Sequence, residues 1–198
     1  MLLSGAGGKA FCAGGDIVSI YHLKAKGDIL SRSEFFFKEY LLDHALATTN
    51  ATLVALWNGI VMGGGVGLSM QAPIRIATEK SVFAMPEATI GFFCDVGGSY
   101  FLPRILNNPA LGLFLGLSSH RFKAKELVEY GVATHYTETE KLDALRADLA
   151  GAGTQAQVQE IVERHCSADG YGSLSAERVA EIESVFKLDS CEEISSRA

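Results

Sequence analysis

The sequence predicts an α/β fold in which short strands and helices form a core and a helical segment follows. With 48% hydrophobic and 20% charged residues, the chain can bury a sizeable core. Within residues 1–136, short apolar stretches alternate with glycine-rich turns and helical patterns. Beyond residue 136 only helical patterns occur. We therefore expect a core domain at residues 1–136 and a helical appendage at residues 137–198.

The first half of the core contains the strand patterns. "GAGGKAFCAGGDI", residues 5–17, ends in a glycine pair and predicts a loop. Residues 33–49 have the apolar spacing of a helix. Residues 51–70 predict a buried strand, a glycine turn and a helix of small residues. Residues 72–87 predict two short strands around a turn at 78–81.

Further helices are predicted after these strands. Residues 107–117 form an apolar helix with proline near its start, and residues 123–132 form a short helix that Gly131 stops. In the appendage, apolar residues at helical spacing predict three helices, which contain Leu142, Val158 and Val179.

Two capping-box patterns accompany the helices of the appendage. Thr137 and Glu140 have the spacing of a capping box that opens the first helix. Ser190 and Glu193 have the same spacing, but only five residues follow Glu193. Such a short segment is either a frayed tail or the beginning of a further helix.

Charge and cysteine usage exclude several classes of function. Residues 1–136 carry 11 Lys/Arg and 10 Asp/Glu, net +1, whereas residues 137–198 carry 6 and 13, net −7. No basic stripe occurs, so we expect no nucleic-acid partner, and no apolar run is long enough for a membrane span. The cysteines lack metal-site spacing, which predicts free thiols in a reducing compartment and no metal site. They are Cys12, Cys94, Cys166 and Cys191.

Two glycine-rich loops and two acids suggest a reactive site. The three glycines at 63–65 are explained either by tight strand–helix packing or by a backbone N–H that binds an oxyanion. The Ala13–Gly15 run can supply a second N–H. Glu87 and Asp95 lie in an otherwise apolar, glycine-rich stretch, where a buried acid needs a partner or a task. Together these features suggest two donors that polarise a carbonyl, with an acid or base beside it.

Three motifs in this order resemble the enoyl-CoA hydratase/isomerase (crotonase) superfamily. They are "GKAFCAGGDI", "NGIVMGGGVGLS" and "FAMPEATIGFFCDVGGSYFLPR". The resemblance implies a crotonase-like β/α spiral core of repeated ββα units, often in homo-oligomers, and an acyl-CoA substrate. It covers residues 2–136 and continues weakly through the acidic helices.

The resemblance also implies roles for individual residues. Gly15 and Gly64 match the two oxyanion-hole donors, and Glu87 and Asp95 match the acids that act on the thioester in the hydrolase branch. Glu39 matches an acidic substrate contact. The enoyl-CoA hydratases carry a second catalytic glutamate at the position of Gly67. The glycine there, with Asp95 present, favours thioester hydrolysis.

The resemblance implies hydrolysis of 3-hydroxyisobutyryl-CoA, a step in valine breakdown, as the expected reaction. Glu87 would either attack the carbonyl to form an anhydride or act as a base for water. Coenzyme A is part of the substrate, and no cofactor is expected. Two alternatives remain open: a crotonase-fold lyase or isomerase acting on an enoyl-CoA, and a non-catalytic binding or assembly protein.

The other candidate residues receive structural interpretations. Asp16 is expected to fix its own loop, and Cys94 has no evident base that would make it a nucleophile. The histidines are isolated in the sequence and are expected to be structural or solvated: His22, His44, His120, His135 and His165.

The resemblance further implies that the family is longer at both ends, so the chain is expected to be an incomplete member with an incomplete appendage. The compartment it implies is the mitochondrion in a eukaryote or the cytoplasm in a bacterium.

Overall fold

The computed structural model describes residues 1–106 and 108–197, and its core is built on two four-stranded sheets. The first sheet is parallel, in the order β1-β3-β5-β8. The second has the order β2-β4-β6-β7, with only β7 antiparallel to its neighbour. The strands of the first sheet are β1 (Leu2–Ser4), β3 (Val54–Trp57), β5 (Ile74–Ala77) and β8 (His135–Tyr136). Those of the second are β2 (Ala10–Cys12), β4 (Ile60–Met62), β6 (Val82–Ala84) and β7 (Phe122–Lys123).

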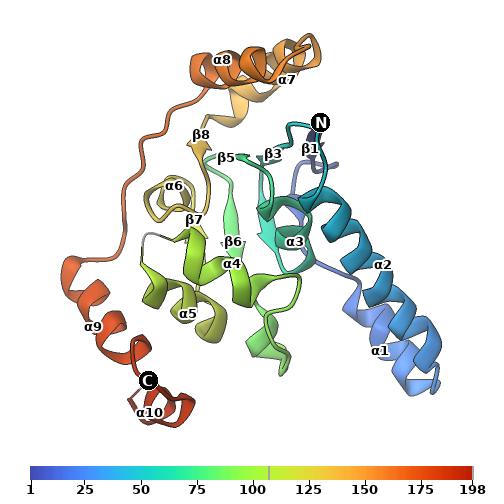
Figure 1. Cartoon of the computed structure of the whole chain (residues 1–198), viewed down its shortest axis with the longest axis vertical. Coiled ribbons are helices and arrows are strands. Elements are labelled where there is room, and N and C mark those ends of the chain that lie inside the picture. Colours follow the sequence, from blue (N-terminus) through green and yellow to red (C-terminus); the bar gives the residue numbers. More distant parts are fainter. Residues whose placement is uncertain (107, 198) are drawn as a thin grey trace.

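From β1 to β6, successive strands alternate between the two sheets. The pairs β1/β2, β3/β4 and β5/β6 each place their first strand in one sheet and their second in the other, and helical segments follow each pair. This repetition winds the chain into a spiral of ββα units, which Figure 1 shows with the strands at the centre and helices around them. The predicted α/β spiral core is confirmed.

Gly59 and Ser81 lie in the turns that connect one strand to the next in the sequence, from β3 to β4 and from β5 to β6. The sequence predicted one buried strand before the glycine turn at 63, but the structure divides it into β3 and β4 at Asn58–Gly59. Gly59 has a φ of +99°, and a β-carbon there would collide with the backbone of Lys9. The predicted turn between β5 and β6 is confirmed, and the Ser81 hydroxyl accepts a hydrogen bond of 2.7 Å from the Thr78 amide.

Two helices precede β3, of which only the second was predicted. Helix α1 (Ile17–Ala25) lies where no helix was expected, and helix α2 (Ile29–Ala47) begins four residues before the predicted start. The Asp16 carboxylate caps α1 by accepting a hydrogen bond of 3.0 Å from the Ser19 amide, so its predicted local role is confirmed. Neither helix contains a buried residue. The alternation of apolar and polar residues that marks a half-buried helix is therefore weak, and it does not show where these two helices begin.

Further helical segments follow β4, β6 and β7. They are α3 (Gly64–Met70), the 3-10 turn η1 (Glu87–Ile90), α4 (Gly98–Ile105), α5 (Pro109–Ser118) and α6 (Glu126–Glu129). Helix α5 confirms the predicted apolar helix, with Asn108 as its cap and Pro109 at its first position; the predicted start at residue 107 lies outside the described residues. Gly131, with a φ of +79°, follows α6 as predicted.

The appendage is helical as predicted. It contains the 3-10 turn η2 (Thr139–Lys141) and helices α7 (Leu142–Ala150), α8 (Gln155–His165), α9 (Ala176–Phe186) and α10 (Cys191–Arg197). The Ser190 hydroxyl accepts a hydrogen bond of 3.2 Å from the Glu193 amide. The second capping pattern therefore marks the beginning of helix α10, and the segment is not a frayed tail.

The capping box predicted at Thr137 and Glu140 is wrong. The Thr137 hydroxyl donates instead to the carbonyl of His165 at 2.8 Å, because the chain at the end of β8 turns beneath the end of α8. Helix α7 has no side-chain cap. A complete capping box forms at the next helix, where Thr154 and Gln157 open α8.

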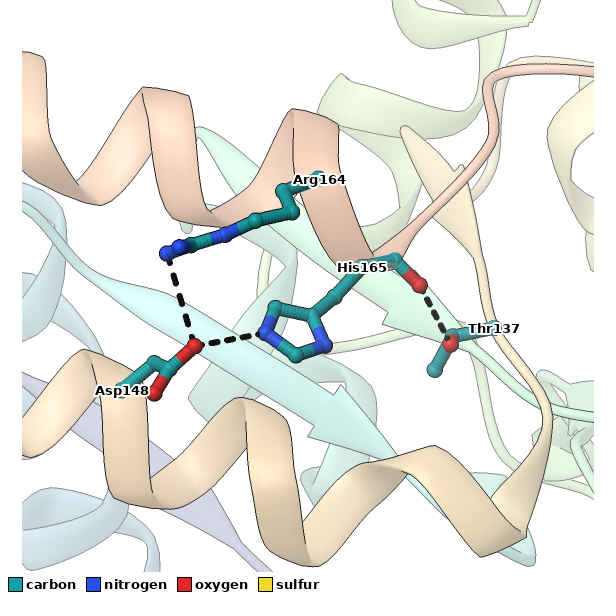
Figure 2. Close-up of polar contacts among 4 residues, drawn as sticks. All are labelled: Thr137, Asp148, Arg164 and His165. Carbon is teal, nitrogen blue, oxygen red and sulfur yellow. Dashed lines mark hydrogen bonds and ion pairs between the residues drawn. The ribbon is translucent and has the colours of Figure 1, made fainter.

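A small polar cluster joins α7 to α8 (Figure 2). Asp148 on α7 accepts a hydrogen bond from the His165 ring nitrogen Nε2 at 2.8 Å and lies 3.4 Å from Arg164, both on α8. Through its carbonyl, His165 also holds Thr137 beside the end of β8. The structural interpretation of His165 is therefore supported by its contacts.

The appendage packs against the core in two separate places. Leu145 on α7 and Val162 on α8 share an apolar cluster with Leu56 and Ile76 of the first sheet. Phe186 on α9 packs edge-to-face on Phe114 of α5, with ring centroids 5.5 Å apart. In Figure 1 the α7–α8 pair lies at one end of the molecule and α9–α10 at the other, joined by an extended segment. The boundary at 136/137 stays a prediction from the sequence. In the described part of the chain, no helix is long and apolar enough to cross a membrane.

Candidate active site

The two glycine-rich loops meet beside the second sheet. One loop follows β2 and the other follows β4, which is its neighbour in that sheet. A β-carbon on Gly64 would lie 3.5 Å from the backbone nitrogen of Gly15, and one on Gly14 would lie 3.3 Å from the carbonyl oxygen of Met62. A β-carbon on Gly65, in the second loop, would collide with the carbonyl oxygen of Cys12 at the end of β2, so the two backbones can approach this closely only with a glycine there, as expected from the sequence.

The proposed oxyanion donors are therefore neighbours in space. Gly64 is the first residue of α3, so its N–H has no acceptor within that helix. A β-carbon on Gly14 would lie 3.6 Å from this nitrogen. Two adjacent backbone N–H groups are the arrangement that stabilises negative charge on a carbonyl oxygen. The roles of Gly15 and Gly64 remain predictions.

Glu87 lies against the second of these loops. It is the first residue of η1, and only 6% of its surface is exposed. A β-carbon on Gly63 would lie 3.0 Å from its Oε1 atom. Burial raises the pKa of Glu87, and the negative charge of Asp95 adds to the shift. A carboxyl with a raised pKa beside a possible oxyanion site is suited to nucleophilic or acid–base chemistry.

Asp95 is presented by a strained turn. The next residue, Val96, has a φ of +45°, which costs a β-branched residue about 1–3 kcal/mol, and Gly97 follows with a φ of +84°. Asp95 Oδ2 accepts a hydrogen bond of 2.8 Å from the hydroxyl of Tyr40 on α2. The structure thus places Glu87 and Asp95 close enough for their charges to interact, as expected from the sequence.

Glu39 joins the site from α2. Its Oε1 occupies the space that a β-carbon on Gly64 would need, so the carboxylate lies directly over the start of α3. Burial raises the pKa of Glu39 to about 7, and the charges of the nearby carboxylates add to the shift. This position agrees with the predicted substrate contact, whose role stays a prediction.

Two neighbours of Glu39 on α2 were not predicted from the sequence. Tyr40 bonds Asp95, as described above. Asp43, one turn beyond Glu39, has both carboxylate oxygens shielded from solvent, with no hydrogen-bond partner in the described part of the chain. Burial raises the pKa of Asp43 to about 6, with a contribution from Asp95. The four-residue spacing between Glu39 and Asp43 was the available signal, since such residues share a helix face.

Gly67 leaves no room for a side chain. A β-carbon there would lie 2.5 Å from Cβ of Val96 and 2.8 Å from Oδ2 of Asp43. Gly67 is itself buried on α3. A glutamate at this position, as in the hydratases, would require both neighbours to move.

A cavity of about 440 Å³ opens beside these residues. Its volume lies in the range of small-molecule sites. It lies between α2, α3 and the turn that carries Asp95, and its lining includes Tyr40, Asp43, His44, Gly67, Asp95 and Val96. His44 is thus closer to the site than its isolated position in the sequence suggested.

Cys94 is poorly suited to act as a nucleophile. Burial, followed by the charge of Glu87, raises the pKa of its thiol to about 12, so the thiol stays protonated at neutral pH. Its Sγ donates to the Gly116 carbonyl at 3.3 Å and lies 3.8 Å from Oε2 of Glu87. Among residues 1–106 and 108–197, no group of three His, Cys, Asp or Glu side chains is arranged to hold a metal ion.

Curated proteins provide relatives over nearly the whole chain. The mitochondrial 3-hydroxyisobutyryl-CoA hydrolases of Xenopus laevis and Homo sapiens are both 42% identical to it, over 98% of its length. That of Dictyostelium discoideum is 39% identical over the same share. The chain spans about half the length of these relatives, 51–53%.

Solved structures show the same fold. A carnitinyl-CoA dehydratase from Mycobacterium thermoresistibile superposes with a TM-score of 0.85 at 35% identity. An enoyl-CoA hydratase from Rhodobacter sphaeroides does so with a TM-score of 0.80 at 30% identity. Each match covers 99% of this chain and 55% of the other.

The family model for enoyl-CoA hydratase/isomerase matches residues 1–198. The spiral of ββα units and the paired glycine loops agree with this match. The chain belongs to the enoyl-CoA hydratase/isomerase family.

Proposed function

We propose that the protein hydrolyses an acyl-CoA thioester, with 3-hydroxyisobutyryl-CoA as its substrate. The observation that carries this proposal is the position of Glu87, buried against the loop that contains Gly63 and Gly64 and electrostatically coupled to Asp95. The substrate is suggested by the names of the relatives that are about 42% identical to the chain. Coenzyme A is part of that substrate, and we propose no separate cofactor.

The proposed reaction consumes one water molecule and releases a carboxylic acid and free coenzyme A. The backbone N–H groups of Gly15 and Gly64 would bind the carbonyl oxygen as it gains negative charge, a contribution for which removal of one donor typically costs about 3–4 kcal/mol. Glu87 either attacks the carbonyl carbon, forming an anhydride that water then opens, or removes a proton from the attacking water. Asp95 orients the substrate hydroxyl or the water, or donates a proton.

Hydration or dehydration of an enoyl-CoA is a second candidate, because the two structural relatives are a dehydratase and a hydratase. That chemistry uses a second glutamate at the position of Gly67, where Val96 and Asp43 fill the space. The packing therefore favours hydrolysis. A non-catalytic role would instead leave acyl-CoA intact.

The deciding experiment measures free thiol released from 3-hydroxyisobutyryl-CoA by the purified chain. We expect release by the unchanged chain, a loss of about 100-fold or more in Glu87→Gln, and no change in Glu160→Gln, which alters an exposed residue on α8. Release that persists in Glu87→Gln would contradict the assignment. Loss of the enoyl absorbance of an enoyl-CoA without thiol release would support the lyase. If the chain carries out neither reaction, that result would favour a binding role.

We further propose a mitochondrial location, on the basis of the relatives named above. We also propose that the protein forms a homo-oligomer, because it resembles a family whose members often do. Fractionation of the source cells, and sedimentation of the purified protein, test these two points.

A further inference from the structure

We propose that Tyr40 is a positioning residue that holds the carboxylate of Asp95 in its working orientation through a direct hydrogen bond. The inference rests on the proposed function, in which Asp95 faces the substrate. It assigns a task to α2 beyond carrying Glu39.

The contact joins two elements that are 55 residues apart in the sequence. The Tyr40 hydroxyl donates to Oδ2 of Asp95 at 2.8 Å, a normal length for a bond between a hydroxyl and a carboxylate. Both side chains line the cavity described above. The bond therefore lies at the wall of this cavity and not in the interior of the protein.

Asp95 needs an external partner because its own backbone is not part of a helix or strand. The segment from Gly91 to Gly97 connects η1 to α4, and both glycines have a positive φ, as does Val96. A second contact between this segment and α2 comes from Phe92, whose ring stacks on Phe36 with centroids 6.0 Å apart. Phe36 lies one helical turn before Tyr40 on α2. The stacked rings fix the segment, and the Tyr40 hydroxyl then orients its carboxylate.

The surrounding charges make a donor at this point valuable. The carboxylates of Glu39, Asp43 and Glu87 all interact electrostatically with Asp95. Their repulsion favours rotation of the Asp95 side chain away from them, toward the open side of the cavity. A hydroxyl that donates to Oδ2 opposes this rotation without adding a positive charge that would pair with Glu87.

Tyr40 keeps its proton over the whole working range of pH. Burial, the hydrogen bond to Asp95 and the charge of Asp95 together raise the pKa of the Tyr40 phenol. The hydroxyl is therefore a permanent donor, and the positioning effect does not depend on pH in the neutral range.

The test compares four forms of the full chain in the thiol-release assay: unchanged, Tyr40→Phe, Asp95→Asn and the double variant. Tyr40→Phe removes only the hydroxyl, so we expect kcat to fall about 10- to 100-fold with little change in KM. In the Asp95→Asn background, Tyr40→Phe should cause no further loss, because residues that act through one another are not additive. Tyr21→Phe is the matched control, since Tyr21 is a 67% exposed tyrosine on α1, and its activity should equal that of the unchanged chain.

A second measurement keeps the inference testable if the unchanged chain releases no thiol, an outcome that would count against the proposed function alone. The ionisation of Tyr40, followed by ultraviolet difference absorbance against Tyr40→Phe, should move to lower pH in Asp95→Asn. Equal Tyr40 ionisation in both backgrounds would overturn the inference. So would an equal loss of kcat from Tyr40→Phe with and without Asp95.

Discussion

The carboxylate of Asp43 on α2 fills the space beside Gly67 on α3, where its Oδ2 would lie 2.8 Å from a β-carbon. Val96 fills the same space from the turn that carries Asp95, at 2.5 Å. Three elements from distant parts of the sequence thus converge on one glycine. This packing leaves no space for a glutamate at that position.

Gly67→Glu is expected to destabilise the protein and not to create a hydratase. Overpacking of this kind costs about 1–3 kcal/mol, and the added buried charge next to Asp43 increases the cost. A loss of this size lowers the melting temperature of a chain of this length by about 2–12 °C, which calorimetry measures. Gly153→Glu, in the exposed turn before α8, is the control and should melt unchanged. A stable Gly67→Glu variant that hydrates enoyl-CoA would contradict the packing argument.

Asp43→Asn is expected to stabilise the protein above about pH 6 and to have little effect near pH 4. Burial raises the pKa of Asp43 to about 6 in the folded protein, above its ordinary value of 3.8. A raised carboxyl pKa means that ionisation opposes folding, so the penalty is absent below pH 3.8, grows between pH 3.8 and 6, and is constant above. Because the side chain is only half-buried, solvent reduces the penalty to about 1–2 kcal/mol.

Urea unfolding of Asp43→Asn at pH 4 and pH 8 measures this difference. Asp169→Asn, at an exposed position between α8 and α9, is the control and should leave the unfolding free energy unchanged in both buffers. A variant whose unfolding free energy equals that of the unchanged chain at pH 8 would show that Asp43 carries no uncompensated charge.

Thr154→Ala is expected to destabilise the appendage, whereas Glu140→Gln is not. Thr154 forms the complete capping box of α8, and loss of such a cap costs about 1 kcal/mol. Glu140 belongs to the pattern that forms no cap, because Thr137 bonds His165 instead. Thermal unfolding of the two variants tests the correction, and a greater loss in Glu140→Gln would contradict it.

The two routes of the proposed hydrolysis differ in where the oxygen of water goes. If Glu87 attacks the thioester, water opens the anhydride, and a single turnover in ¹⁸O-water can leave the label in the Glu87 carboxylate. If Glu87 acts as a base, the label enters only the released acid. Mass spectrometry of the peptide that contains Glu87 detects this label, whose presence would establish the anhydride route, with the peptide that contains Glu160 as an internal unlabelled control.

Local patterns predicted those parts of the fold that depend on neighbours in sequence. The strands around the turn at 78–81, helix α5 with its proline and the helices α7, α8 and α9 all follow from apolar spacing and turn residues. Helix α1 was missed because its apolar residues, such as Ile17, Val18 and Tyr21, are exposed and spread around the helix, so they form no single stripe. The cap at Thr137 failed because a longer-range hydrogen bond to His165 replaced the local one.

In the site, the two glycine loops, Glu87 and Asp95 could be recognised from the sequence alone, since small residues and acids within apolar runs are unusual enough to be noticed. Three contacts could be seen only in the folded protein: Tyr40 bonds Asp95, Asp43 lies against Gly67, and Val96 fills the space that another side chain at Gly67 would need. The physical reason is that these contacts join α2, α3 and the turn before α4, which are far apart along the chain and become neighbours only when the spiral of strands has formed.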